Sequence, residues 1–156
     1  MTTLDILNKM PIDNFQIEKF LGKNIKIVKD NDIKDYKDIN QLFPVDDVCV
    51  VLLEKMNNIG HWVCLLRYED YYEYFDSFGD KPPKFIRDLL KKTNKKIIYN
   101  CVKLQDIKLA TCGKFCVIRI FYKDVEYITF IKLLRYLKKI TKLSFDDICS
   151  GILNNI

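Results

Sequence analysis

The sequence contains a single histidine and no apolar run long enough to cross a lipid bilayer. A membrane-spanning helix needs about 20 consecutive apolar residues, and runs such as residues 48–53 are much shorter. The N-terminus also lacks the basic region and long apolar stretch of a secretory signal peptide. We therefore expect a protein that neither contacts membranes nor is secreted, with its six cysteines as reduced thiols in a cytosol-like compartment.

Internal repeats and low-complexity linkers are also missing, so residues 1–156 are expected to form a single domain. Apolar residues make up 49% of the chain and charged residues 30%, which is typical of a soluble globular protein. The formal net charge of +5 is mildly basic. That charge is compatible with nucleic-acid binding but does not indicate it.

Apolar periodicity and turn residues predict the order of the elements. Helices are expected at residues 4–10, at 14–21 between an Asp13 cap and Gly22, at 84–93, at 113–122, at 127–137, and from a Ser144 cap to about residue 151. Strands are expected at 24–28, 48–53, 60–67, 72–76 and 97–102, with 29–41 as loop and 57–60 as a turn. This order predicts an α+β fold, in which a small, mostly antiparallel or mixed sheet packs on a central buried helix.

Cys112 stands where a loop turns into an apolar helix. Residues 115–122 are apolar almost all the way round, as in a helix buried in a core. Free backbone N–H groups and the helix dipole at such a start favour thiolate over thiol. Gly113 permits a tight turn and the close approach of a substrate. Gln105, seven positions before Cys112, could donate to an oxyanion beside the Cys112 N–H.

His61 and Asp76 lie on two predicted strands joined by a turn at Glu69 and Asp70. With a two-residue loop, Val63 would pair with Asp76, and His61 would point to the same side because it lies two positions from Val63. The two side chains would then be neighbours across the hairpin. A loop of odd length would separate them.

Together these residues have the chemistry needed to cleave a peptide bond. Cys112 would attack the carbonyl, and His61, as the one imidazole of the chain, would hold the thiolate and later protonate the leaving amine. Asp76 would fix the imidazole tautomer. Gln105 and the Cys112 N–H would stabilise the tetrahedral oxyanion.

Each residue also has a purely structural interpretation. Cys112 could be a buried core cysteine, and His61 a half-buried strand residue bonded to the backbone. Trp62 could belong to the core rather than form a platform for substrate, and Asp76 could bond to the N–H groups of an ordinary turn.

The other cysteines offer no clear metal site. A zinc site would have to combine His61, Cys101, Cys112 and Cys116. It would lack the usual knuckle spacing and a second ligand pair, so we expect no metal. Cys49, Cys64 and Cys101 lie in predicted apolar strands, and we interpret them as small core residues.

Three motifs together resemble the adenain-like cysteine proteases, the family of the adenovirus maturation protease. They are Gly60-His61-Trp62, then Phe75-Asp76-Ser77-Phe78-Gly79, then Gln105 with Cys112-Gly113-Lys114-Phe115-Cys116. The order His, acid, Gln, Cys is the signature of the wider clan, which includes SUMO- and ubiquitin-like-deconjugating proteases. Asp76 stands where the adenovirus enzymes have Glu, whereas the deconjugating enzymes have Asp followed by Ser. The spacing from Gln105 to Cys112 fits the adenain branch better.

The resemblance implies a cysteine endopeptidase with Cys112, His61, Asp76 and Gln105 as catalytic residues, and with Trp62 and Gly113 at the substrate. It implies a monomer that processes viral capsid and core precursors at glycine-containing sites and requires no cofactor, although DNA or an activating peptide could serve as one. The expected location is the host cytoplasm or viral factory and the virion. The alternatives are a SUMO- or ubiquitin-like deconjugating protease and a catalytically idle binding module.

Two groups of basic residues could form a surface that binds a nucleic acid. Basic residues gather at Lys132, Arg135 and Lys139 on one helix face and at Lys91, Lys92, Lys95 and Lys96 elsewhere. Such faces are usually only solvated, but the resemblance implies weak, sequence-independent DNA binding.

A deconjugating protease would also need a broad surface for a folded partner. The N-terminal part offers four aromatic candidates, Phe15, Phe20, Tyr36 and Phe43. Of these, Phe15 and Phe20 better fit the inward face of a helix.

Overall fold

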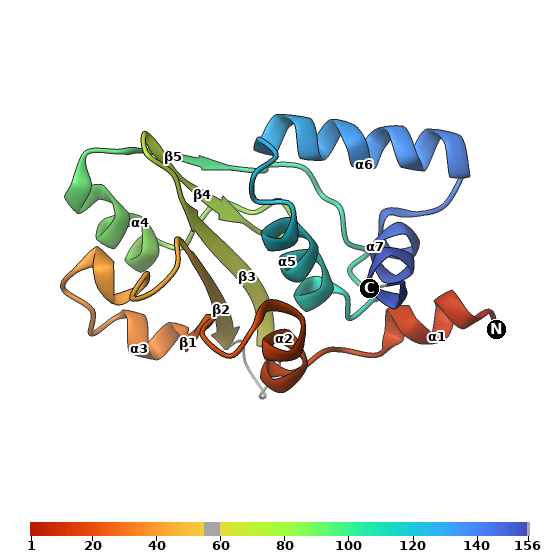
Figure 1. The fold of residues 1–156 in the computed structure, drawn as a ribbon, viewed down its shortest axis with the longest axis horizontal. Helices are drawn as coiled ribbons and strands as arrows, with labels where there is room; N and C mark the ends of the chain where they lie inside the picture. Colours follow the sequence, from red (N-terminus) through yellow and green to blue (C-terminus); the bar gives the residue numbers. More distant parts are fainter. Residues whose placement is uncertain (55–59, 156) are drawn as a thin grey trace.

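The computed structural model describes residues 1–54 and 60–155 (Figure 1). The turn predicted at residues 57–60 lies outside this part of the chain, apart from Gly60, which begins a strand. The helices are α1 (Thr3–Lys9), α2 (Asn14–Leu21), α3 (Asp30–Ile33), α4 (Lys84–Leu90), α5 (Cys112–Phe121), α6 (Tyr127–Thr141) and α7 (Phe145–Asn154), with short 3-10 turns η1 (Ile39–Gln41) and η3 (Lys91–Thr93). The strands are β1 (Lys26–Lys29), β2 (Val48–Glu54), β3 (Gly60–Arg67), β4 (Tyr71–Phe75) and β5 (Lys96–Tyr99).

The strands form one mixed sheet in the order β1-β2-β3-β4-β5. The inner pairs β2–β3 and β3–β4 are antiparallel, whereas the outer pairs β1–β2 and β4–β5 are parallel. Parallel neighbours need a crossover connection, which α3 with η1 supplies at one edge and α4 with η3 at the other. The predicted α+β fold is confirmed.

Helices cover both faces of the sheet. In Figure 1, α3 and α4 lie on one side, whereas α5 lies against the other side with α6 and α7 outside it. The two faces contribute to two separate apolar clusters, one containing Val50, Cys64 and Phe115 and the other Val51, Val63 and Leu90. A strand covered on both faces is apolar at nearly every position, which explains the continuous run at residues 48–53.

The predicted hairpin register is confirmed. Cys64 pairs with Phe75 and Leu65 with Tyr74, and the Tyr68 N–H donates to the Tyr71 carbonyl at 2.9 Å, which closes a two-residue loop. This register places His61 on the same side of the sheet as Asp76, the residue directly after β4, and the two side chains are in contact.

Three predicted boundaries were wrong. Strand β5 ends at Tyr99 rather than at residue 102. Residues 29–41 are not all loop, because α3 forms where Ile33, which is 2% exposed, packs into the cluster under the sheet. Helix α7 does not end near Gly151 but continues to Asn154. Burial of Leu153 in the other cluster offsets the low helix propensity of that glycine.

Several aromatic and cysteine side chains also differ from expectation. Phe15 is 72% exposed rather than inward, because Ile17 occupies the buried position of the short helix α2. Phe20 does pack against the core, and Phe43 is buried and therefore unavailable as an anchor. Cys101 is exposed, not a core residue, because it follows the end of the edge strand β5. No helix in the described residues is long and apolar enough to span a membrane.

Candidate active site

Cys112 is the first residue of α5, at the point where the chain enters the core. The following residues 113–120 are all buried, whereas Cys112 itself is partly exposed. The N-cap residue Thr111 does not cap the helix with its side chain. Its hydroxyl instead donates to the buried carboxylate of Asp146 on α7. The start of α5 is therefore held by a residue of α7, while the Cys112 thiol stays partly exposed.

His61 and Asp76 meet across the hairpin. The distance from His61 Nε2 to Asp76 Oδ1 is 2.7 Å, and both side chains are buried. The same Asp76 oxygen accepts the Phe78 N–H at 2.8 Å. The Phe78 ring stacks on the imidazole with 4.5 Å between ring centroids. The imidazole is thus held at its edge by a carboxylate and on its face by an aromatic ring.

The imidazole is poised to be protonated. Burial by itself lowers the pKa of His61, but the hydrogen bonds to Asp76 and Cys112 outweigh it and raise the pKa to about 9. Because Nε2 faces Asp76, Nδ1 is the ring nitrogen available to the Cys112 thiol. An opposite charge or a hydrogen bond to the charged form shifts a pKa in this direction.

The pKa of the Cys112 thiol is shifted in the opposite direction from that of His61. Burial raises the pKa of Cys112, but its hydrogen bonds to His61 and to the Trp62 backbone outweigh the burial, so the pKa lies below its ordinary value. Burial raises the pKa of three other thiols, those of Cys49, Cys116 and Cys149. A thiolate is both nucleophile and metal ligand, so Cys112 differs chemically from these buried cysteines.

Gln105 lies on the loop that leads to Cys112, and its side chain is buried. Its Nε2 donates to the Leu109 carbonyl at 2.7 Å, and its Oε1 accepts the Ser77 hydroxyl at 2.6 Å. The Gln105 N–H donates to the Ser77 carbonyl as well. An amide nitrogen has two donors, so one remains after the bond to Leu109. The structure joins Gln105 to the turn that carries Asp76, and its action on an oxyanion stays a prediction.

Trp62 and Gly113 lie against each other beside the thiol. A Cβ atom on Gly113 would be 2.7 Å from Ile12 Cγ1 and 3.0 Å from Trp62 Cδ1. The Trp62 indole also donates to the Ile12 carbonyl at 3.2 Å. Glycine at this position therefore has a packing reason, since any side chain would displace Ile12 or Trp62. Substrate contact by Trp62 and Gly113 stays a prediction.

A metal centre is not evident in the part of the chain that the structure describes. No group of three or more His, Cys, Asp or Glu side chains there lies close enough to hold an ion. Of the conceivable zinc ligands, Cys116 is buried in the core and Cys101 is exposed. What the site contains is a thiol next to an imidazole that is hydrogen-bonded to a carboxylate, which is an arrangement for nucleophilic catalysis.

No family model matches the sequence. The sequence is similar to the uncharacterized protein V9 of Sputnik virophage, with 31% identity over 173 residues, covering 96% of this chain and 91% of that protein. The chain belongs to the same family as V9. Among solved structures, this V9-family chain is similar to the ASFV pS273R protease, with a TM-score of 0.61 and 16% identity over 92% of this chain and 67% of that chain. The selenomethionine form of the same protease gives a TM-score of 0.55 with the same coverage. At this identity the similarity shows a shared fold.

Two residues that support the site in this V9-family protein were not singled out from the sequence. Asn100, fully buried after β5, accepts the Asp76 N–H at 3.0 Å and donates to the Asp76 carbonyl at 2.6 Å. Asp146 binds both Thr111 and the Asp106 N–H. An asparagine closing an apolar strand was the available signal for the first. Nothing local to α7 pointed to the second.

Proposed function

We propose that this V9-family protein is a cysteine endopeptidase. The observation that carries the proposal is the buried hydrogen bond between His61 and Asp76 beside Cys112 at the start of a buried helix, with the pKa of the thiol lowered and that of the imidazole raised. The fold shared with a viral protease supports it. So does the match to the adenain-like motifs.

The reaction follows from these charges. The Cys112 thiolate attacks the scissile carbonyl, and the oxyanion that forms accepts from the Cys112 N–H and the free Gln105 donor. The His61 imidazolium then gives its proton to the leaving amine, which leaves a thioester on Cys112. Neutral His61 next takes a proton from water, which attacks the thioester. Release of the carboxylic acid restores the thiolate and the imidazolium.

The proposed substrates are viral capsid and core precursors, cut at glycine-containing sites during virion maturation. A virophage relative and a viral structural neighbour support a viral setting. Trp62 and Ile12 crowd the space above Gly113, which favours a substrate residue without a side chain at the cut. The enzyme would act as a monomer in the host cytoplasm or viral factory and inside the virion. DNA or an activating peptide would assist it without being required.

The test is hydrolysis of quenched fluorescent peptides that contain a central glycine. We expect turnover by the wild-type protein and none by Cys112→Ala, with product masses that locate the cut. A Cys101→Ala variant is the matched control, because it removes an exposed thiol outside the site. Activity that survives Cys112→Ala, or that is lost equally in Cys101→Ala, would contradict the assignment.

One observation favours the deconjugating alternative. Phe15 is 72% exposed on α2 and could anchor a folded partner. The two functions separate in an assay with a short glycine-containing peptide and a ubiquitin-like fusion at equal concentration. We expect preference for the peptide, because a maturation protease needs only a groove for an extended segment. Strong preference for the fusion, lost in Phe15→Ala, would select deconjugation instead.

A further inference from the structure

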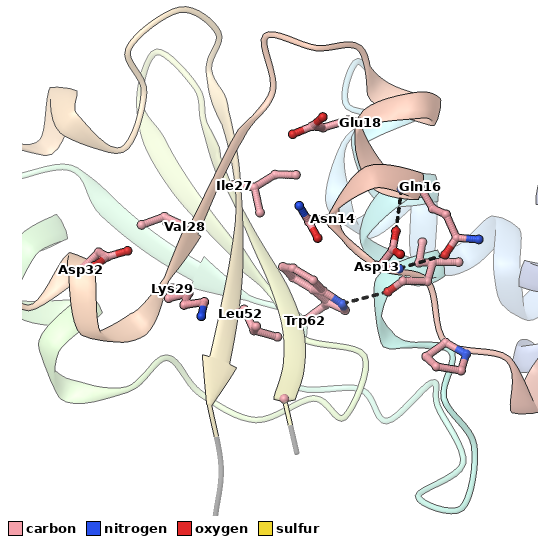
Figure 2. A pocket seen from close by; sticks show the side chains of 13 residues that line it. Asp13, Asn14, Gln16, Glu18, Ile27, Val28, Lys29, Asp32, Leu52 and Trp62 are labelled. Carbon is pink, nitrogen blue, oxygen red and sulfur yellow. Dashed lines mark hydrogen bonds between the residues drawn. The ribbon is translucent and has the colours of Figure 1, made fainter. Parts of the chain in front are cut away.

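A groove of about 810 Å³ lies over the end of the sheet beside Trp62. Its floor is apolar and comes from three neighbouring strands, with Ile27 from β1, Leu52 from β2 and Trp62 from β3. Figure 2 shows these side chains around one hollow, with α2 on one side of it and β1 with α3 on the other. The volume is in the range of ligand-binding pockets, which runs from about 300 to 1,000 Å³.

The groove adjoins the candidate active site through Trp62. Trp62 follows His61 in β3, and its ring lies against Gly113, the residue after Cys112, while it also lines the groove. Gly60, which precedes His61, lines it as well. A peptide with its scissile carbonyl at Cys112 would therefore place the residues on one side of the cut in this groove.

The described residues that line the groove carry a net negative charge, whereas the formal net charge of the whole protein is positive. Carboxylates of Asp13, Glu18 and Asp32 line it, although the chain has a formal net charge of +5. Among the described residues of the lining, Lys29 is the one cation, and it lies 3.2 Å from Glu54 and so is compensated. Figure 2 shows Glu18 and Asp32 on opposite sides of the apolar floor.

We propose that this groove binds an extended, basic substrate segment and makes the enzyme selective for a lysine or arginine near the cut. The inference rests on the proposed peptidase function. The aliphatic stem of such a side chain would lie along Ile27 and Leu52, while its charge would reach Glu18 or Asp32. Trp62 adds a ring face on which a cation can rest. The same carboxylates repel nucleic acid and acidic peptides.

Binding can be measured without turnover in the Cys112→Ala protein. The probes are fluorescein-labelled peptides with one central glycine that differ at a single position, which is scanned over four residues on each side of the glycine. At one or more positions we expect lysine to bind roughly three- to tenfold more tightly than glutamate, as expected for one or two partly exposed ion pairs. Equal binding of lysine, norleucine and glutamate at every position would overturn the proposal.

Charge reversal identifies the carboxylates responsible. The double variant Glu18→Lys with Asp32→Lys should abolish or invert the preference for lysine in both the binding assay and the cleavage assay. Asp35→Lys is the matched control, because Asp35 is exposed and does not line the groove. An unchanged preference in the double variant, or an equal loss in Asp35→Lys, would contradict the assignment of these residues.

The two proposals fail in different ways. Wild-type cleavage of lysine and glutamate peptides at equal rates, with equal binding by Cys112→Ala, would leave the peptidase standing and refute the groove. Charge-dependent binding without any cleavage by the wild type would refute the peptidase and reduce the groove to a site for basic peptides.

Discussion

At the scale of single residues, His61 lies between the Cys112 thiol and the Asp76 carboxylate. Its protonation sets the upper end of the pH range in which we expect peptide cleavage. The imidazolium persists below a pKa of about 9, and the thiolate persists above the lowered pKa of Cys112. Both charges exist only between these two values. We expect kcat/KM for peptide cleavage to rise through the pKa of Cys112 and to fall near pH 9.

The same ion pair predicts selective alkylation. Iodoacetamide at mildly acidic pH should label Cys112 well before the other five cysteines, because thiolates paired with imidazolium titrate as low as roughly 3–4. Mass spectrometry of tryptic peptides measures the order of labelling. Exposed Cys101 is the internal control, since it is reachable but lies outside the site. Labelling of both at the same rate would argue against the pair.

Asp76→Asn should lower the rate without abolishing it, whereas His61→Ala should be inactive. An asparagine oxygen could still accept from the Phe78 N–H and from the imidazole, which preserves the turn. Loss of the acid lowers kcat about 10⁴-fold in the serine proteases, and we expect a smaller loss here because the thiolate is already formed. The alkaline limb of the pH profile should move to lower pH, as Asp76 raises the pKa of His61. An unmoved limb would mean that another group holds the imidazole proton.

At the scale of structural elements, the loop from Gln105 to Thr111 is tied down at both ends. Ser77 holds the Gln105 side chain, and Asp146 holds Thr111. We expect Gln105→Ala to lower kcat with little change in KM, because its amide would act only on the transition state. Ser77→Ala should give a smaller kcat loss, since it frees Gln105 without removing it. Weaker substrate binding at unchanged kcat would place Gln105 outside the oxyanion hole.

Strand β4 and helix α5 are joined by a buried ion pair. Arg119 Nε and Nη2 lie 2.7 and 2.8 Å from the two Glu73 oxygens, with both side chains inaccessible. Removing one partner of such a pair typically costs about 3–5 kcal/mol. We expect Arg119→Met to lower the free energy of unfolding in urea by that amount. Glu73→Leu in the same chain should recover much of it. Lys84→Ala, which breaks an exposed pair with Asp88, is the control and should change stability by less than about 1 kcal/mol.

The sequence alone predicts those features that are determined by neighbouring residues. The hairpin and the row His61–Asp76 follow from loop length and the period of a strand, and the caps at Asp13 and Ser144 follow from neighbouring residues. Other features depend on interactions between distant segments. The Glu73–Arg119 pair, the bond from Asn100 to Asp76 and the short helix α3 require the tertiary arrangement first, and no local pattern specifies it.

At the scale of the whole molecule, one group of basic residues lies on α6, an element that does not line the acidic groove. Lys132, Arg135 and Lys139 are exposed along α6, whereas Lys92 and Lys95 donate to backbone carbonyls of other segments. We therefore expect α6 to carry any DNA binding. Changing these three residues to glutamate should weaken binding to a labelled duplex, and the slope of log affinity against log salt should fall by about 0.9 for each phosphate that the protein no longer neutralises.

The control for that experiment reverses the same number of charges on another surface. Glutamate at Lys9, Lys19 and Lys23 gives an equal change in net charge at exposed sites on and beside α1 and α2. Equal weakening in both variants would show a response to net charge alone. No association of the wild type at low salt would remove DNA as a partner.

The candidate site is assembled from segments at both ends of the chain. The Ala110 N–H donates to the Asn8 carbonyl, and the buried Lys114 donates to the Leu7 carbonyl. Asn8 is bonded in turn to Asp147 and Ser150 of α7. The loop before Cys112 therefore depends on α1 and α7 together.

This dependence determines when the candidate site can form during synthesis. Helix α7 is the last described element to leave the ribosome, and before it does so Thr111 has no carboxylate to bind and α1 has no helix to dock on. Domains generally fold as units during synthesis, so the candidate site would be complete only after α7 has left the ribosome. The proposed peptidase could therefore not cut neighbouring nascent chains before its own α7 has been made.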